Sequence, residues 1–280
     1  MNLPHIATLW PKISIVTPSY NQGRYVEETI RSVLAQNYPN LEYIIMDGGS
    51  TDNSVAIIKK YEPRLAYWVS EKDKGQADAI HRGFERATGE IIGWLNSDDY
   101  LLPGALKKVG KRFSAMPDLE FLVGGGIVVD DQGKRIGKQY SFPQSYLSLL
   151  SIGQFFMQMS SFWRRSAYLD LGGLDTSLRF CFDYELFLRL AKRQSPQGMD
   201  ALLSAFRIHN DSKTSTIWQT VGMAEFAQIK ESHCSENHIE IEQAASAHYT
   251  RQYHLNKRWG VIKDLIRDPG FFTLNVCKKL

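Results

Sequence analysis

Short runs rich in β-branched residues alternate with segments of helical periodicity over roughly the first hundred residues, and this alternation constrains the fold most. The strand-like runs are 12–17, 42–46, 65–70 and 90–96. The segments with helically spaced apolar residues between them are 26–36, 53–62 and 76–88. Such alternation with short connections favours right-handed βαβ units. We therefore expect an α/β fold of Rossmann-like type, with a mainly parallel central sheet flanked by helices.

The residues at two helix ends allow more local predictions. Asp52 precedes the helical segment 53–62 and is a residue type that commonly caps a helix N-terminus. Gly89 follows the segment 76–88, and glycine is common in the left-handed conformation just past a helix C-terminus. We expect Asp52 to be an N-cap and Gly89 to be left-handed.

The regular alternation weakens after about residue 118. A hairpin is indicated over 121–137, turning at 131–133, and the pattern of 183–193 predicts a helix. Residues 214–255 are mixed and mostly helical in character. We divide the chain into a lead-in (1–10), a main domain (11–216) and a basic helical extension (217–280). The main domain comprises a nucleotide-binding half (11–118) and an acceptor-side half (119–216).

The composition excludes several classes of protein. Hydrophobic residues make up 43% and charged residues 22%, which is the balance of a folded globular chain. A net charge of +3 is too small to suggest a nucleic-acid binder. The chain has no apolar run near the ~20 residues that a membrane helix needs. The N-terminal residues lack the pattern of a secretory signal, and three widely spaced cysteines suggest a reducing compartment. We expect a cytoplasmic protein.

The basic residues concentrate at the end of the chain. From Arg251 to Leu280 there are seven Lys or Arg residues against two Asp, interspersed with aromatic residues. One interpretation is peripheral contact with the anionic inner face of a membrane. The other, which we prefer, is a solvated helix packed by its aromatic side chains.

Acidic residues follow three successive predicted strands. Asp47 ends the second strand, Asp73 follows the third, and Asp98 and Asp99 follow the fourth. Ligands of open α/β sheets bind outside the carboxyl ends of the strands, so these carboxylates are predicted to share one rim. Each could instead cap a turn or a helix.

Clustered carboxylates without a Cys/His set suit a hard divalent cation, which prefers oxygen ligands and often bridges to a diphosphate. The chain lacks GxxxxGK[ST], and GxGxxG does not follow the first strand, so P-loop enzymes and dinucleotide dehydrogenases fit poorly. HExxH and GxSxG are also absent. The remaining interpretation is a metal-held diphosphate from which a sugar or another group is transferred.

Four stretches in the order and spacing of a known family resemble the family 2 glycosyltransferases. They are ISIVTPSYNQGRYVEETIRSVLAQNYPNLEYIIMDGGSTDNS, EKDKGQADAIHRGFERATGEIIGWLNSDDYLLPGAL, SFWRRSAYLDLGGLDTSLRFCFDYELFLRL and FRIHNDSKTS. The resemblance covers about residues 11–216. It implies an inverting enzyme with the A-type glycosyltransferase (GT-A) fold, a nucleotide-sugar donor and a divalent metal, Mn²⁺ or Mg²⁺.

The resemblance also implies roles for residues of the donor and metal sites. Asp47 corresponds to the aspartate that contacts the nucleotide base, and the loop bordering that base contains Thr17, Pro18 and Tyr20. We add Asp73 and Gln76 to the donor site. Within NSDD, Asp98 and Asp99 are expected to hold the metal and the ribose, with Asn96 where many relatives have another Asp. His209 corresponds to a histidine that reaches the metal or the diphosphate.

Asp183 aligns with the family's catalytic base. Phe182 stands where the family has a first acid, and an apolar neighbour can raise a carboxylate's pKa toward neutrality. Glu185, two residues further on, is a poor second candidate. The resemblance therefore predicts that Asp183 takes the proton from an acceptor hydroxyl as it attacks the anomeric carbon, in one inverting displacement.

The predicted function is thus transfer of a sugar to a saccharide or lipid-linked acceptor, in polysaccharide or glycoconjugate biosynthesis. The alternative is a catalytically silent nucleotide-sugar-binding module of a biosynthetic complex. Asp183 and the Asp98–Asp99 pair favour the enzyme. The donor base stays open among uridine, deoxythymidine and guanosine, because Asp47 suits any imide N–H.

Overall fold

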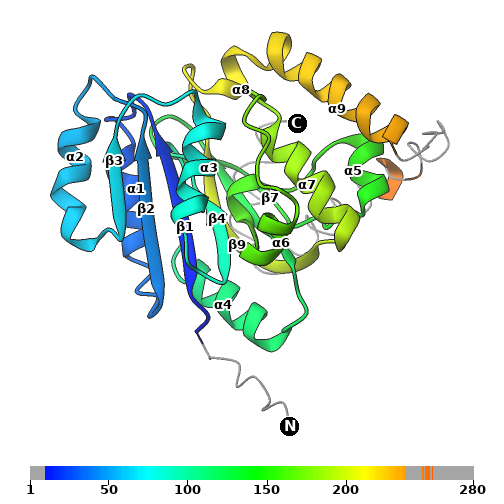
Figure 1. Ribbon diagram of the computed structural model, residues 1–280, viewed down its shortest axis with the longest axis horizontal. Coiled ribbons are helices and arrows are strands. Elements are labelled where there is room, and N and C mark those ends of the chain that lie inside the picture. The colour runs from blue at the N-terminus through cyan, green and yellow to red at the C-terminus, as the bar shows by residue number, and fades with distance from the viewer. Residues whose placement is uncertain (1–9, 237–247, 249, 253, 255–280) are drawn as a thin grey trace, which may run out of the picture.

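The predicted strand–helix alternation forms one half of a single sheet. The computed structural model describes residues 10–236, 248, 250–252 and 254. Within them, nine strands run in the order β3-β2-β1-β4-β8-β6-β9-β5, with β7 paired to β6 (Figure 1). The strands are β1 (Ile13–Ser19), β2 (Leu41–Asp47), β3 (Tyr67–Ser70), β4 (Ile91–Trp94), β5 (Tyr100–Leu101), β6 (Phe121–Val129), β7 (Arg135–Gln139), β8 (Ser161–Arg164) and β9 (Gln197–Arg207).

Helices connect and cover these strands. The α-helices are α1 (Val26–Leu34), α2 (Ser54–Tyr61), α3 (Gln76–Arg86), α4 (Ala105–Ala115), α5 (Tyr146–Ile152), α6 (Arg165–Asp170), α7 (Phe182–Arg193), α8 (Lys213–Thr216) and α9 (Met223–Glu236). Short 3₁₀ turns cover Glu62–Arg64 and Gln158–Ser160, and a π-helical turn covers Trp218–Gly222.

The first four strands are all parallel, as the alternation predicts. β1 pairs with β2 and β4, and β2 pairs with β3. The sheet as a whole is mixed, however, because β8 lies antiparallel to both β4 and β6. In addition, β7 pairs antiparallel with β6, and β5 pairs antiparallel with β9. For β7 the reason is local, since a short turn can join only antiparallel neighbours. That turn closes at Gly133, which has a φ of 81°, so the predicted hairpin is confirmed.

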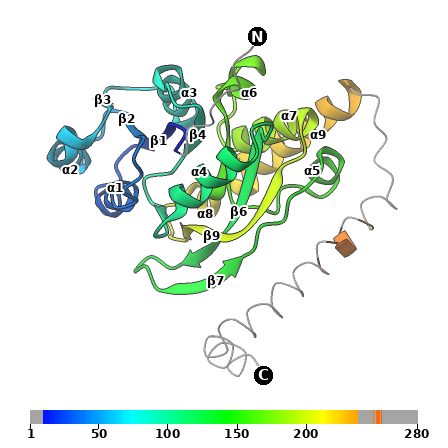
Figure 2. The same cartoon turned by 90° about the horizontal axis from the view of Figure 1, so that it is seen from below.

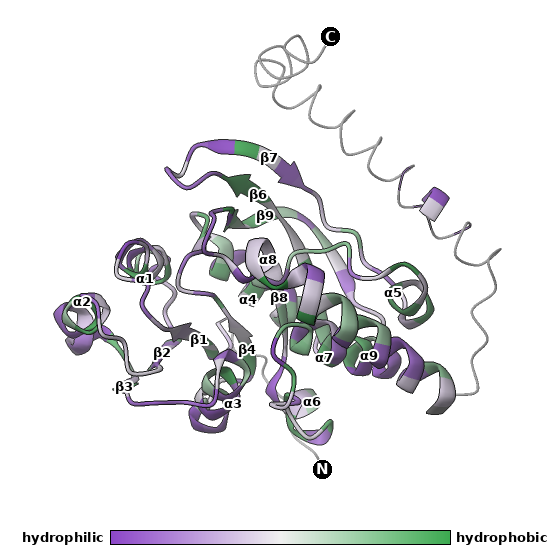
Figure 3. Ribbon diagram, turned by 90° about the horizontal axis from the view of Figure 1, so that it is seen from above, coloured by the Kyte–Doolittle hydropathy of each residue, from purple (hydrophilic) through white to green (hydrophobic). Residues whose placement is uncertain are grey.

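Apolar residues of alternating orientation give the sheet a core on each face. Val16, Ile44 and Met46 face one cluster, which includes residues of α3, α5, α6, α7 and α9. Ile13, Ile15 and Ile45 face the other, which includes residues of α1, α2 and α4. Figure 2 shows β1, β2 and β4 lying between α3 on one side and α1 on the other. Figure 3 shows mainly hydrophilic residues on the outer side of α3.

The two local predictions fare differently. α2 begins at Ser54 with Asn53 at its cap position, but Asp52 accepts a hydrogen bond from the Ser54 N–H at 2.9 Å and so serves the first turn. Gly89 is not left-handed, so that prediction is wrong. Position 89 has no room for a side chain, since a Cβ there would lie 2.3 Å from Ser14 Oγ.

The described part of the C-terminal segment packs on the main domain. Phe226 of α9 lies 4.8 Å from Tyr184 of α7 between ring centroids, and Lys230 Nζ donates to Ser151 O at 3.2 Å. Among the described residues, no helix has the length and apolar character to cross a bilayer. Except for 251, 252 and 254, the tail from Arg251 lies outside the described residues, so the preferred solvated helix and the alternative membrane contact both stay predictions.

Glu42 links the start of the sheet to the loop before β4, and we predict a pH-dependent contribution to stability. Burial alone would raise its pKa, but hydrogen bonds from Lys12, Ser14 and Thr88 lower the pKa to about 2. Because the folded-state pKa lies below the unfolded value of about 4.5, the contribution is present above pH 4.5 and is lost as pH falls toward 2.

Glu42→Gln should therefore lower the free energy of unfolding by up to roughly 3 kcal/mol near neutrality. Urea unfolding between pH 3 and 7 measures this, with the exposed Glu62→Gln as the control. The difference between wild type and Glu42→Gln should shrink as the pH falls. A difference that is independent of pH would contradict the assignment.

Candidate functional site

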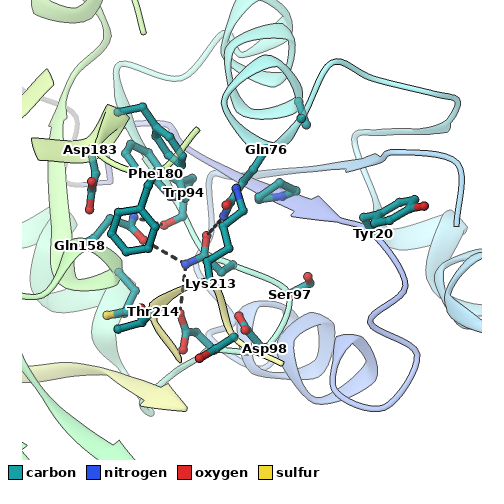
Figure 4. Close-up of a pocket in the computed structure, with 18 of the residues that line it drawn as sticks. Tyr20, Gln76, Trp94, Ser97, Asp98, Gln158, Phe180, Asp183, Lys213 and Thr214 are labelled. Carbon is teal, nitrogen blue, oxygen red and sulfur yellow. Dashed lines mark hydrogen bonds between the residues drawn. The ribbon is translucent and has the colours of Figure 1, made fainter. Parts of the chain in front are cut away.

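A cavity of about 1050 Å³ opens beside the carboxyl ends of the first four strands. Those strand ends contribute lining residues at 18–20, 48–49, 72–76, 94 and 96–99, so the predicted common rim exists. The second half contributes lining residues at 154, 156–159, 179–180, 182–183, 206, 211–214 and 217–218. Seven of the predicted site residues line the cavity: Pro18, Tyr20, Asp73, Gln76, Asp98, Asp99 and Asp183. Figure 4 shows Asp183 and Tyr20 on opposite sides of it.

The predicted base-binding residues divide into an exposed pair and a buried pair. Pro18 and Tyr20 line the cavity, and Tyr20 is 61% exposed. Thr17 and Asp47 are buried and do not line it. Thr17 Oγ1 lies 3.1 Å from Tyr43 OH, and Asp47 accepts hydrogen bonds from Ser50 and Ser70. Asp47 thus orders the loop that follows β2, and its contact with a nucleotide base stays a prediction.

Asp73 lies in the loop between β3 and α3, and Gln76 is the first residue of α3. A Cβ on Gly48 would lie 2.6 Å from Asp73 Oδ2, so only glycine lets this carboxylate approach the end of β2. Gln76 Nε2 donates to Asn96 Oδ1 at 2.8 Å. Asn96 Nδ2 in turn donates to Asp99 Oδ2 at 3.3 Å and to Gln158 Oε1 at 3.4 Å. Asn96 thus links both halves of the cavity wall.

The two neighbouring aspartates have different environments. Asp99 is 1% exposed, and its Oδ1 accepts a hydrogen bond from the Arg207 N–H at 2.9 Å. Burial, followed by the nearby charge of Asp98, raises the pKa of Asp99 well above its usual value. Asp98 instead retains an exposed side-chain fraction of 19%, and its Oδ2 lies 3.0 Å from His209 Nε2. Asp98 is therefore the aspartate of this pair that is open to a ligand.

Asp98 and His209 fit a divalent cation as a pair. The described residues contain no cluster of three or more His, Cys, Asp or Glu side chains arranged around a metal position. Mg²⁺ and Mn²⁺ sites commonly use only one or two protein ligands, with phosphate and water supplying the rest. Neighbouring ligands around an octahedral ion with bonds of ~2.1 Å lie about 3 Å apart. Asp98 Oδ2 and His209 Nε2 lie at a hydrogen-bond distance of 3.0 Å, which is also close to that separation.

Arg207 holds this arrangement together, and the sequence analysis missed it. Its side chain is 3% exposed. Its Nε donates to Asp98 O at 3.0 Å, its Nη1 lies 3.2 Å from both Asp130 O and Asp131 O, and its Nη2 pairs with Glu28. The sequence feature that could have indicated this role is an arginine at the end of the largely apolar strand that leads to His209.

Asp183 lies in the first turn of α7, next to the cavity-lining Phe182. Burial raises the pKa of Asp183 to about 6, although the Tyr184 N–H and the charge of Lys213 act in the opposite direction. Glu185 is engaged by Arg189, with atoms as close as 2.5 Å. The lower ranking of Glu185 as a base therefore agrees with the geometry.

Basic side chains at the cavity were also missed. Lys72, Lys74, Arg179 and Lys213 contribute to its lining. Lys213 Nζ donates to Arg179 O at 3.0 Å, and burial, followed by the charge of Arg179, lowers the pKa of Lys213. The sequence feature that could have pointed to Lys213 is its position four residues after His209. These cations could offset the charge of a bound diphosphate.

Carboxylates and a cavity at the strand ends of an open α/β sheet are typical of nucleotide-binding enzymes, and this arrangement agrees with the A-type glycosyltransferase class. The Glycosyl transferase family 2 model matches residues 14–171, more than half of the chain, and the chain belongs to this family. It is a nucleotide-sugar-dependent glycosyltransferase.

Relatives and solved structures agree with this assignment. The uncharacterized glycosyltransferase Rv1514c of Mycobacterium tuberculosis is 30% identical over 201 residues, which is 70% of this chain and 75% of that protein. TarS 1–349 of S. aureus, solved with UDP-GlcNAc, has a TM-score of 0.62 at 16% identity, covering 95% of this chain and 76% of TarS 1–349. The mannosyltransferase PcManGT of Pyrobaculum calidifontis, solved with GDP-Man and Mn²⁺, has a TM-score of 0.60 at 19% identity, covering 90% and 72% of the two chains. The predicted GT-A fold is confirmed.

Arg207→Gln should lower the free energy of unfolding by roughly 2 to 3 kcal/mol, because it removes a buried guanidinium that donates to several part-buried acceptors. The matched control is Arg193→Gln. Arg193 also pairs with two acidic side chains, Glu120 and Asp170, but its side chain is 37% exposed. This control should cost much less than Arg207→Gln, because exposed ion pairs contribute little to stability. Urea unfolding measures both, and equal losses would contradict the role given to Arg207.

Proposed function

We propose that this glycosyltransferase is metal-dependent and inverting, and that it transfers a sugar from a nucleoside diphosphate to a hydroxyl of a saccharide or lipid-linked acceptor. We place the reaction in polysaccharide or glycoconjugate biosynthesis. One observation carries the proposal: Asp183, with a pKa of about 6, lines the same cavity as Asp98, which His209 contacts.

In this proposal Asp98 and His209 hold the cation. When bound, the cation would neutralise negative charge that develops on the leaving diphosphate. Asp99 would support the metal site indirectly. Its carboxylate accepts the Arg207 N–H and so holds the end of β9, which leads to His209. PcManGT was solved in complex with Mn²⁺, which supports this choice of metal.

Asp183 acts as the general base in this proposal. A carboxyl group with a pKa of about 6 is largely ionised at neutral pH and still basic enough to accept a proton. Asp183 would take the proton of the acceptor hydroxyl while that oxygen attacks the anomeric carbon from the face opposite the diphosphate. Holding donor and acceptor in line would supply much of the rate.

The donor would extend across the cavity from Tyr20 toward Asp183. Pro18 and Tyr20 would border the base. Asp73, in the β3–α3 loop, and Gln76, at the start of α3, would contact the ribose or diphosphate. TarS and PcManGT were solved with UDP-GlcNAc and GDP-Man respectively. Uridine and guanosine donors are therefore the first to test.

Asp183→Asn should lower kcat at least ~10³-fold, since the amide cannot accept the proton, while the donor Kd changes less than about twofold. Steady-state transfer assays and calorimetry measure the two quantities. The exposed Asp118→Asn is the control. In the wild type, kcat/KM should rise with pH through about 6 and then level off, because the ionised form of Asp183 is the active one. Retained turnover in Asp183→Asn would remove the base assignment.

Asp98→Asn and His209→Gln should each reduce the Mn²⁺-dependent gain in donor affinity at least tenfold, because each removes a proposed ligand of the cation. Thermal-shift titrations with UDP-GlcNAc and GDP-mannose, in Mn²⁺ or EDTA, measure this without an acceptor. The matched variant Asp99→Asn should keep most of the metal dependence. If Asp99→Asn abolishes the metal dependence and Asp98→Asn does not, the assignment of the two residues is reversed.

A further inference from the structure

Three backbone N–H groups directly before α7 are bound by one side chain from the C-terminal segment. Glu225, in the first turn of α9, accepts hydrogen bonds at Oε1 from the Arg179 N–H at 2.7 Å and at Oε2 from the Phe180 and Cys181 N–H groups at 2.9 and 2.8 Å. A charged acceptor makes each of these bonds stronger than a neutral one would. No motif of the sequence analysis pointed to Glu225.

The segment 179–181 is held from more than one direction. Lys213 Nζ donates to Arg179 O at 3.0 Å, and the Cys181 thiol lies 3.3 Å from Gly222 O. The rings of Phe180 and Trp218 lie 5.4 Å apart between centroids. The contacts come from α8, the π-helical turn and α9, so the ordering of this segment depends on residues after His209.

This segment forms the wall of the cavity next to the proposed base. Arg179 and Phe180 line the cavity, and Asp183 follows Cys181 by two residues. Figure 4 shows Phe180 and Asp183 on the same side of the cavity. Free movement of 179–181 would shift the first turn of α7 and admit water to Asp183, and a displacement of about 1 Å can cost a large factor in rate.

We propose that Glu225 is a positioning residue for the catalytic base, and that residues 217–236 are therefore part of the catalytic unit. The proposal rests on the function proposed above for Asp183. Glu225 makes no proposed contact with substrate; it acts by fixing the backbone that leads into α7. The domain boundary expected at 216 would then separate the base from the side chain that positions it.

Glu225→Ala tests this, with Glu231→Ala as the matched control because Glu231 is exposed on the same helix. Glu225→Ala should lower kcat at least tenfold, with a change of less than threefold in the Kd for UDP-GlcNAc or GDP-mannose, whichever the wild type binds. Hydrogen exchange of the amides of 179–181 should accelerate at least tenfold, while exchange in β1 and β2 stays unchanged. Glu231→Ala should change none of these quantities.

Glu225→Gln provides the conservative comparison. Its side chain keeps one acceptor oxygen, so the loss in kcat should be about threefold and the exchange rates intermediate. Urea unfolding identifies any variant that fails to fold, and Glu225→Gln then carries the test. Accelerated exchange with unchanged kcat would overturn the proposal for Glu225 and leave the base assignment intact. Turnover in Asp183→Asn would instead overturn the base assignment, whatever Glu225 does.

Discussion

The contact between the loop that follows β4 and the end of β9 determines how the site is built. At this contact the Asp99 carboxylate accepts the Arg207 N–H, and the Arg207 guanidinium binds the Asp98 carbonyl in return. The loop after β4 and the strand that leads to His209 are thus held by reciprocal bonds between buried groups. This contact joins the parallel half of the sheet to the mixed half and sets Asp98 beside His209.

Burial raises the pKa values of both Asp99 and Asp183, but the two carboxyl groups have different roles. Asp99 is enclosed, and its carboxyl group is used to hold the backbone of β9. Asp183 is also desolvated, but its side chain is only half-buried, so a substrate proton could reach it from the cavity. Burial therefore produces an internal tether at one position and a candidate base at the other. Both residues line the cavity, and the remaining exposure of Asp183, more than the direction of the pKa change, separates the two roles.

Much of this architecture could be predicted from local sequence patterns. Periodicity was sufficient for the four parallel strands, and parallel strands necessarily bring Asp73 and Asp98 to one edge. The sequence could not show which carboxylates were already satisfied. Asp47 is engaged by Ser70, and Asp99 by Arg207, which is 108 residues away. The antiparallel insertion of β8 and the role of Glu225 likewise depend on contacts between distant segments, to which periodicity is insensitive.

The order in which these contacts occur along the chain has a consequence for synthesis on the ribosome. Residues 13–94 hold the first four strands, which pair in parallel with one another and could pair soon after they emerge. Arg207 reaches back to Glu28, and Glu225 to the segment before α7, so the far side of the cavity closes only after both have been translated. A nascent chain would thus present a rim of carboxylates to the cell well before it possesses an ordered wall opposite them. The interval between the two events is set by the translation time of about the last half of the described chain.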